Sequence, residues 1–412
     1  MPTSAAFRLL GADATGSRER ALALSADDTI ALIEGSELRG RGGAGFPLGA
    51  KMRATRTAAE VSGGPAYVVA NAYDADPASP LSRTLLERSP ELVLGGIVIA
   101  ARAVGAREAW LYLHPEATAA RSAAEKAIAA VARHDDGVSV EIALGPGGFM
   151  GGEESALLAV LENKRAMARQ RPPWPAEQGV RLRPTLVSSA ETLAALPLIV
   201  RDGPDSFSGS GGSRGTKLVS VTGAVAEPGV YEVSLGATLG EVVQTAGGVT
   251  HALKAIHVGG PTCGILNSTR TGVRYDYEDL KAAGTYMGSG QVRAIAEGTC
   301  IVAEAARLFE YLSKETCAIC VPCRVGTKRV RGILESIYSG LGREDDLKWL
   351  GELADHLNDF SLCGFGITSA SIVRTTIAEF PDDYRAHIVE RRCPEGTCAP
   401  SRSRRYETMA QP

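Results

Sequence analysis

Short apolar runs alternate with longer segments of helical periodicity over the first half of the chain. Tyr67–Ala70 and Ala109–Leu113 have the length and composition of buried strands, and Val138–Ile142 alternates as an edge strand does. Leucine, valine and isoleucine recur at helical spacing over Leu85–Val104, and Ala117–Ala132 is an alanine-rich predicted helix. Strands that alternate with helices predict an α/β domain in which helices cover a sheet.

The pattern changes after Gly203–Gly215, a glycine- and serine-rich segment that predicts a linker. Beyond it, Leu218–Thr222 and Val230–Val233 are predicted strands, and Leu239–Ala246 is a short helix that ends at two glycines. These elements indicate a small mixed domain. From about residue 291 the periodicity is helical and predicts a bundle. Its expected helices are Ile301–Lys314, Gly326–Gly340, Asp345–Phe360 and Ser369–Phe380.

Composition excludes several classes of protein. The net charge of −3 and an aromatic content of 5% argue against a nucleic-acid surface. The longest apolar stretch, Leu92–Ala101, is too short to span a bilayer, and residues 1–31 lack the pattern of a signal peptide. We therefore expect a cytoplasmic protein without direct membrane insertion, which reaches the cytoplasmic face of a membrane only if partners hold it there.

Cys317-Ala-Ile-Cys320-Val-Pro-Cys323 is the most informative motif of the chain. Three thiols at this spacing can converge on one small volume, and Cys363, between two predicted helices, can supply a fourth ligand. The spacing favours a [4Fe–4S] cluster, because zinc sites more often pair two separate two-cysteine knuckles. The alternative is a set of buried structural thiols.

The other four of the eight cysteines form no such set. Cys263 and Cys300 are isolated in the sequence and are expected to be packed thiols. Cys393 and Cys398 frame a short segment near the end of the chain. Two cysteines cannot hold a second cluster, so this segment is expected to be a remnant of a longer tail or a contact with another subunit.

Two glycine-rich loops are the second chemical signal. Arg39-Gly-Arg-Gly-Gly-Ala-Gly-Phe-Pro47, followed by Lys51, combines backbone N–H groups that can face a ligand with positive charge that suits a phosphate. The spacing fits neither a P-loop nor a dinucleotide fingerprint, and a surface loop without a ligand is the alternative. Gly145–Glu154 enters a predicted helix with two carboxylates, Glu153 and Glu154, which either cap that helix or meet ribose hydroxyls.

Together these motifs resemble the flavin- and NADH-binding subunit of respiratory complex I, the 51 kDa type, and its relatives in soluble hydrogenases and formate dehydrogenases. The resemblance covers nearly the whole chain. It rests on Arg39–Pro47, Gly152-Glu-Glu154, Pro172-Pro-Trp-Pro175, Glu191-Thr-Leu193 and the cysteines Cys317, Cys320, Cys323 and Cys363. It implies an NADH dehydrogenase subunit that is the electron entry of a multi-subunit oxidoreductase, with hydride transfer from NADH to FMN and single-electron transfer to a [4Fe–4S] cluster.

The changes of pattern along the chain, together with the resemblance, predict a division into parts. The expected parts are an FMN/NADH-binding α/β domain at 1–202, a linker at 203–216, a soluble-ligand-binding β-grasp domain at 217–290, a helical [4Fe–4S] domain at 291–390 and a basic flexible tail at 391–412.

The resemblance assigns roles to residues one at a time. Glycines of the first loop and Asn71 would line the flavin, Phe46 and Lys51 would meet the dinucleotide, and Trp174 stands where the family has a phenylalanine on adenine. Glu154, at the nicotinamide end, is the expected catalytic residue. Acids near the dinucleotide would favour NADH over NADPH. The implied cofactor-binding set is Gly40, Arg41, Gly42, Gly43, Phe46, Lys51, Asn71, Asp76, Gly152, Glu153, Glu154, Trp174, Ser188 and Ser189.

Several positions depart from the family pattern. An aspartate that faces the flavin is replaced by Tyr73, and a cysteine in the second glycine loop by Gly151. The remaining departures are Ala54 for an aromatic residue, Asp74 and Asp76 for glutamates, Phe149 for tyrosine, and Ser188 and Ser189 for an asparagine pair. They motivate an alternative, a non-catalytic iron–sulfur relay or scaffold with a degenerate flavin and NADH site. A ligand-binding protein built around residues 217–290 has less support.

One flavin and one cluster provide an entry for electrons but no final acceptor. By resemblance, the expected partners are a thioredoxin-like [2Fe–2S] subunit and a larger cluster-bearing subunit that dock near the cysteines. The basic tail could contribute to docking, although a solvated tail is the simpler expectation.

Overall fold

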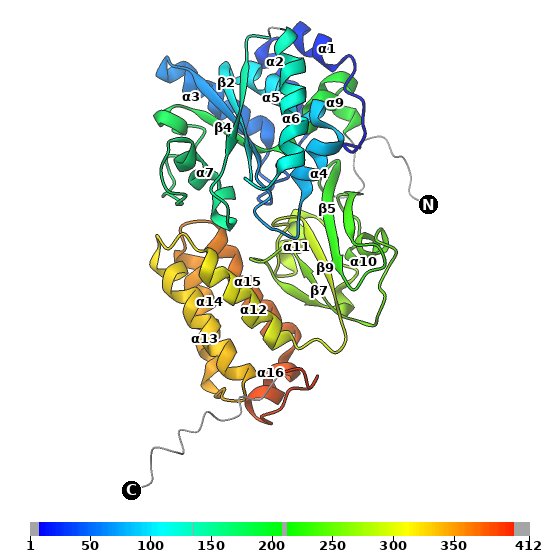
Figure 1. The fold of residues 1–412 in the computed structure, drawn as a ribbon, viewed down its shortest axis with the longest axis vertical. Helices are drawn as coiled ribbons and strands as arrows, with labels where there is room; N and C mark the ends of the chain where they lie inside the picture. The colour runs from blue at the N-terminus through cyan, green and yellow to red at the C-terminus, as the bar shows by residue number, and fades with distance from the viewer. Residues whose placement is uncertain (1–7, 135, 208–211, 399–412) are drawn as a thin grey trace.

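The computed structural model describes residues 8–134, 136–207 and 212–398. Figure 1 shows an α/β part, a second sheet below it, and a helical bundle beside that sheet. This is the expected fold class, an α/β domain followed by a small β-grasp-like domain and a C-terminal helical bundle. Residues 208–211 of the expected linker and residues 399–412 of the expected tail lie outside the described residues.

The first sheet consists of β1 (Ala66–Ala72), β2 (Ala106–Leu113), β3 (Ser139–Leu144) and β4 (Thr185–Ser189). The strands are parallel in the order β3-β2-β1-β4, so β3 is an edge strand as predicted. The chain leaves β1 on the side of β2 and returns on the other side as β4. A reversal of this kind opens a crevice at the carboxyl ends of the two strands, where ligands bind in open α/β sheets.

Helices cover both faces of this sheet, because β1 is apolar on both sides. Val68 and Ala70 belong to the core that contains α5, and Tyr67 and Val69 belong to the cluster that contains Leu157 of α7. The helices of this part are α1 (Ser17–Ala23), α2 (Ala26–Gly35), α3 (Leu48–Ser62), α4 (Leu81–Arg88), α5 (Pro90–Val104), α6 (Thr118–Val131), α7 (Glu154–Leu161), α8 (Ala190–Ala194) and α9 (Leu196–Asp202).

The single helix predicted over Leu85–Val104 is two helices, α4 and α5. Pro90 separates them, since proline lacks an N–H and is accommodated in the first turn of a helix, where it stands in α5. The prediction was wrong on this point because the apolar periodicity continues across the break.

The second sheet has the order β6-β5-β9-β7-β8. Its elements are β5 (Thr216–Gly223), β6 (Gly229–Ser234), α10 (Leu239–Gln244), β7 (Leu253–Val258), β8 (Ile265–Asn267), α11 (Tyr277–Ala282) and β9 (Gln291–Ala296). β9 lies beyond the expected boundary at residue 290, yet it pairs with β5 and β7 in the middle of the sheet. We therefore propose that the helical domain begins after Ala296.

An ion pair joins α8, the helix that follows β4, to β5 of the second sheet. Lys217 Nζ lies 2.6 Å from a carboxylate oxygen of Glu191, and both side chains are buried. The other carboxylate oxygen accepts the Leu218 N–H at 2.7 Å. Removal of either partner would leave a buried charge without compensation, so this pair fixes the sheets relative to each other.

The bundle consists of α12 (Ile301–Glu315), α13 (Thr327–Tyr338), α14 (Asp345–Phe360), α15 (Gly364–Glu379) and α16 (Pro381–Ile388). The four predicted helices are confirmed, α14 with the predicted ends and the other three with shifted ends, and α16 was not predicted. Cys393 and Cys398 pack against the bundle core, so the first residues of the expected tail return to the protein. No helix in the described part of the chain combines the length and the apolar character that a bilayer crossing requires.

Candidate functional site

Four segments meet at the carboxyl edge of the first sheet. Asn71 at the end of β1 lies in register with Ser189 at the end of β4. The Asn71 side-chain amide donates a hydrogen bond of 2.9 Å to the carbonyl oxygen of Gly152, in the second glycine loop. A Cβ atom added to Gly42, in the first glycine loop, would lie 3.5 Å from the Ser189 Cβ. The structure thus brings residues of both glycine loops to the crevice between β1 and β4.

The glycines of the first loop serve different purposes. Gly43 has φ +108° and an added Cβ would lie 2.7 Å from the Gly288 carbonyl oxygen, while Gly45 has φ +67° and faces the Tyr277 ring. These two are required by packing against the second sheet domain. Gly42 would make only an ordinary contact if it carried a Cβ, so the protein itself does not require glycine there. This is the loop position best suited to close approach by a ligand.

Arg41 is committed to the fold. Its side chain is 3% exposed, and its guanidinium donates to the carbonyl oxygens of Arg39, Arg214 and Thr216 at 2.6–2.9 Å. Its backbone N–H donates to Thr192 Oγ1 at 2.8 Å. The Arg41 guanidinium, which was expected to meet a phosphate, therefore holds the first glycine loop between the two sheet domains.

Lys51 and Glu154 form a pair beside the crevice. Lys51 Nζ lies 2.9 Å from one Glu154 carboxylate oxygen, and an Arg171 nitrogen lies 3.2 Å from the other. Arg171 also stacks 5.1 Å from the Trp174 ring centroid. Phe46 and Trp174 are 55% and 52% exposed, which is unusual for large aromatic side chains and leaves their faces available for stacking.

Two of the expected acids are turned toward the protein. Glu153 caps α7 and accepts the N–H groups of Ser155 and Ala156 at 2.8 Å, which is the capping role left open by the sequence. Asp76 is buried and accepts the Ser289 hydroxyl at 2.6 Å, and burial raises the pKa of its carboxyl. Neither carboxylate has the free reach toward a dinucleotide that the resemblance implied.

Tyr73 and Gly151, both departures from the family pattern, are sterically coupled. Tyr73 is buried and stacks on Tyr112 with ring centroids 5.3 Å apart. A Cβ added to Gly151 would lie 2.4 Å from the Tyr73 hydroxyl oxygen, and one added to Gly145 would lie 2.3 Å from the ring. The tyrosine lies beneath the glycine loop and belongs to the apolar cluster, so it does not project into the crevice.

The remaining departures have local partners. Asp74 accepts the N–H groups of Ser82 and Arg83 at the start of α4, at 2.9 and 2.8 Å. Ser189 caps α8, with its hydroxyl 2.7 Å from that of Thr192, and Ser188 is buried in β4. Ala54 lies exposed on α3.

The cysteine motif lies between α12 and α13, where π-helical Pro322–Gly326 carries Cys323. Cys317, Cys323 and Cys363 are buried, and Cys320 is half-buried. Burial raises the pKa of the thiols of Cys323 and Cys363 to about 12. Buried thiols stay protonated without compensating charge, and metal binding supplies that charge, so this donor set fits an iron–sulfur cluster.

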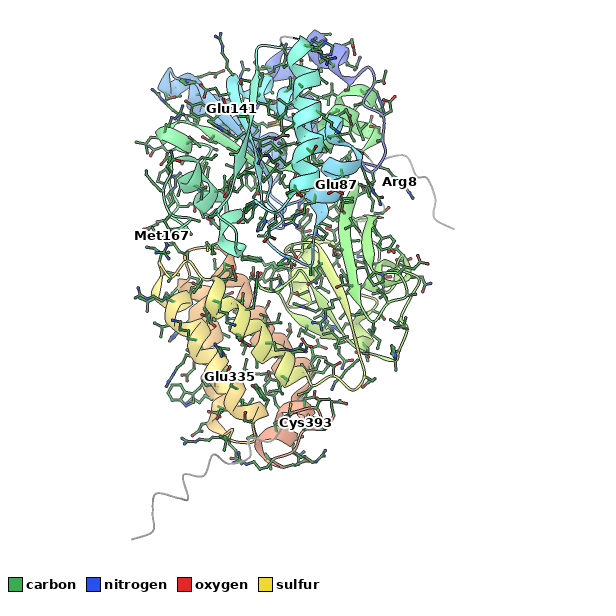
Figure 2. All side chains as sticks on the ribbon, in the orientation of Figure 1. Arg8, Glu87, Glu141, Met167, Glu335 and Cys393 are labelled. Atoms are coloured by element: carbon green, nitrogen blue, oxygen red, sulfur yellow. The ribbon has the colours of Figure 1, made fainter. Side chains whose placement is uncertain are left out.

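The second glycine loop contacts the segments that carry Cys317, Cys320, Cys323 and Cys363, which together make up the cysteine pocket. The Phe149 N–H donates to a Glu315 carboxylate oxygen at 2.6 Å, two residues before Cys317. The Phe149 ring lies 5.5 Å from that of Phe365, two residues after Cys363. This contact joins the α/β part to the bundle, near the labelled Met167 in Figure 2.

Sequence reasoning missed one group of side chains. Cys300, His387, Cys393 and Cys398 have ligand atoms that all lie within 4.8 Å of one another. They come from separate segments, so no compact motif announces them. The sequence signal that could have identified them is His387, which closely precedes the Cys-x4-Cys segment Cys393–Cys398.

Comparisons with known proteins agree with this arrangement. A family model described as the Nuo51 FMN-binding domain matches residues 33–198. A second, the NADH-ubiquinone oxidoreductase-F iron–sulfur binding region, matches residues 303–387, and an SLBB domain model matches residues 218–266.

Similar proteins cover nearly the whole chain. The second NADH-quinone oxidoreductase F protein of Rhizobium meliloti (strain 1021) is 36% identical over 89% of this chain and 90% of its own length. The NADP-reducing hydrogenase subunit HndC of Solidesulfovibrio fructosivorans is 35% identical over 92% of this chain and 80% of its own. A crystal structure of NAD+-reducing [NiFe]-hydrogenase in the H2-reduced state matches 92% of this chain with a TM-score of 0.83 and 34% identity. This chain spans 65% of that hydrogenase chain.

Proposed function

The chain belongs to the family of NADH-quinone oxidoreductase F subunits, and on this premise we propose that it works as the electron entry of an oxidoreductase complex. When bound, FMN accepts a hydride from NADH and passes the electrons singly to a [4Fe–4S] cluster, a conversion needed because the cluster takes one electron at a time. The observation that carries the proposal is the contact of Phe149 with Glu315 and Phe365, which joins the second glycine loop, held to β1 by Asn71, to the cysteine pocket.

We assign the flavin to the crevice between β1 and β4. Gly42 is exposed and carries no side chain to hinder a flat ring, and the Asn71 amide holds the second glycine loop at Gly152. Ser189 is half-buried, and its hydroxyl, which accepts the Thr192 N–H, keeps a hydrogen that it can donate to a phosphate. Arg41 contributes its position in the loop and not its charge, since three carbonyl oxygens already accept from its guanidinium.

We assign NADH to the opening beside Lys51 and Glu154. Phe46 and Trp174 offer exposed aromatic faces for the nicotinamide and adenine ends. Glu154 is held by Lys51 and Arg171, so it can accept hydrogen bonds from an amide or a ribose without reorganising. Of Glu153, Glu154 and Asp76, only Glu154 can then favour NADH over NADPH. The carboxylates of Glu153 and Asp76 already accept hydrogen bonds from protein groups.

We assign the cluster to Cys317, Cys320, Cys323 and Cys363. Cys320 is the least buried of the four, and the segments around it expose apolar side chains to solvent. These are Ile319, Val321, Val325 and Phe360. An exposed apolar patch beside a redox centre suits the docking of a protein that receives electrons.

Relatives of the chain are subunits of multi-subunit complexes. We propose that this chain likewise works with other iron–sulfur subunits in the cytoplasm, a thioredoxin-like [2Fe–2S] subunit and a larger cluster-bearing subunit. Pull-down from native extract should recover an iron–sulfur protein, and Val321→Glu should reduce the yield. Full turnover with a physiological acceptor by an isolated monomer would contradict this part.

The visible spectrum of anaerobically purified protein tests the electron-entry function. Addition of NADH should bleach flavin bands and part of the broad cluster absorbance. A cluster absorbance without flavin bands, unchanged by NADH after incubation with FMN, would favour the scaffold alternative and contradict the proposal.

A further inference from the structure

Four metal-binding side chains meet at the end of the bundle that lies away from the first sheet. Cys300 precedes α12, His387 is in α16, and Cys393 and Cys398 belong to the segment that follows α16. Their ligand atoms lie within 4.8 Å of one another, and Cys300 and His387 are buried. Figure 2 labels Cys393 at this end of the molecule.

This group is separate from the proposed cluster pocket. Cys300 caps the start of α12, whereas Cys317 lies just beyond its end. A helix of 15 residues is about 22 Å long, so the two cysteine groups lie far apart. The second group therefore needs an explanation of its own.

The histidine is oriented as a ligand. His387 Nδ1 lies 2.6 Å from the backbone carbonyl oxygen of Asp383. A carbonyl oxygen can only accept, so Nδ1 carries the hydrogen and Nε2 keeps a free lone pair. Nε2 lies 3.5 Å from Cys300 Sγ, which in turn accepts the Ala303 N–H at 3.5 Å. Support of this kind behind a ligand is typical of histidines that bind metals.

We propose that Cys300, His387, Cys393 and Cys398 form a structural zinc site. Three thiolates and one imidazole are a donor set that zinc prefers, and four protein ligands leave no open position for catalysis. The terminal ligands of a cubane cluster bind four different iron atoms, whereas these four atoms are close enough to share one ion. A Cys393–Cys398 disulfide would leave Cys300 and His387 without a shared partner.

The zinc ion fastens the C-terminal segment to the rest of the protein. Lys254 Nζ, in β7, lies 2.9 Å from a carboxylate oxygen of Asp383 and 2.5 Å from one of Glu395. Glu395 stands between Cys393 and Cys398 in the sequence. The ion and this lysine together tie the segment to the start of α12, to α16 and to the second sheet. The short helix α16 gains a fixed end in this way.

Metal analysis of the full chain, purified anaerobically with its cluster, tests the proposal. We expect about one zinc per chain in addition to iron, and X-ray absorption at the zinc edge should show sulfur at about 2.3 Å and nitrogen at about 2.0 Å. Cys398→Ser should lower the zinc content about tenfold or more and leave the iron content unchanged. Cys263→Ser, which changes a buried thiol outside both groups, is the control and should keep zinc.

Three results would overturn the proposal. The first is wild-type protein that neither contains zinc nor takes it up when zinc is added. The second is wild-type protein whose mass is lower by two hydrogen atoms, which shows a disulfide in place of the metal. The third is loss of iron from Cys398→Ser when wild-type protein contains no zinc. If Cys398→Ser does not fold, the zinc content of His387→Gln and the zinc-edge X-ray absorption spectrum of wild-type protein test the proposal instead. Full zinc content in His387→Gln, or a spectrum without sulfur ligands, would overturn it.

Discussion

At the carboxyl edge of the first sheet most polar side chains are engaged by the protein itself, whereas the thiols of Cys317, Cys320, Cys323 and Cys363 lie in or against the apolar core of the bundle. Arg41, Glu153 and Asp76 donate to or accept from nearby protein groups. In the pocket, the thiols of Cys317 and Cys320 lie close enough to Cys323 to influence its pKa. A cluster requires four donor atoms, while a flat cofactor requires mainly space and backbone groups, so the two regions use side chains differently.

Removal of one donor from the cysteine pocket should have the largest effect. Cys320→Ser should lose most of its iron and lower the thermal stability of the bundle, because the cluster joins the loop after α12 to the start of α15. Iron and acid-labile sulfide per chain measure the loss, with Cys263→Ser as the control. Full iron and sulfide in Cys320→Ser would show that the pocket does not hold the cluster.

Two neighbouring glycines should separate ligand binding from folding. Gly42→Val should abolish FMN binding and leave the melting temperature nearly unchanged, since an added Cβ meets the Ser189 side chain only at ordinary contact distance. Gly43→Ala should instead destabilise the fold, because its φ of +108° and the Gly288 carbonyl oxygen at 2.7 Å exclude a side chain. Flavin fluorescence after desalting and thermal unfolding measure the two effects. Retention of FMN by Gly42→Val would contradict the assignment of the crevice.

The coupling of Tyr73 and Gly151 predicts non-additive stability changes. Gly151→Cys alone should cost about 1–3 kcal/mol of unfolding free energy, because its Cβ would overlap the Tyr73 ring. In a Tyr73→Ala background the same change should cost at least about 1 kcal/mol less, since the space is then free. Urea unfolding of the four proteins measures the coupling. Equal costs in both backgrounds would mean that the two departures are independent.

Asp74 should affect stability and not nucleotide binding. Burial raises the pKa of Asp74 to about 6 from its ordinary value of 3.8. The stability contributed by its proton is therefore present below about pH 4 and is lost as the pH rises through about 6. Asp74→Asn should remove a pH dependence on the order of 3 kcal/mol over this interval and leave the KM for NADH unchanged. Identical pH profiles for the two proteins, or a changed KM, would contradict this role.

The sequence predicted the architecture well where periodicity and local chemistry agree. The helix at Asp345–Phe360 has the predicted ends, and the strand at Leu218–Thr222 lies within β5. The prediction from sequence failed at Pro90, where one apolar pattern continues across the break between two helices. It also failed at β9, because the central position of this strand in the second sheet depends on pairing with distant strands.

The candidate site divides in the same way. The spacing of Cys317, Cys320 and Cys323 is a local property, so the motif could be found without a structure. The engagement of Asp76 by Ser289 and the grouping of Cys300 with His387 depend on tertiary contacts across long stretches of chain. Sequence spacing carries no information about such contacts.

The electron route from the sheet edge to the cysteine pocket is the central claim, and one comparison tests it directly. Anaerobic NADH is added to wild-type protein and to Gly42→Val, and the reduced cluster is followed by electron paramagnetic resonance. NADH should reduce the cluster in wild-type protein and not in Gly42→Val, whereas dithionite should reduce it in both. Equal reduction by NADH in the two proteins, or none in flavin-loaded wild-type protein, would contradict the account.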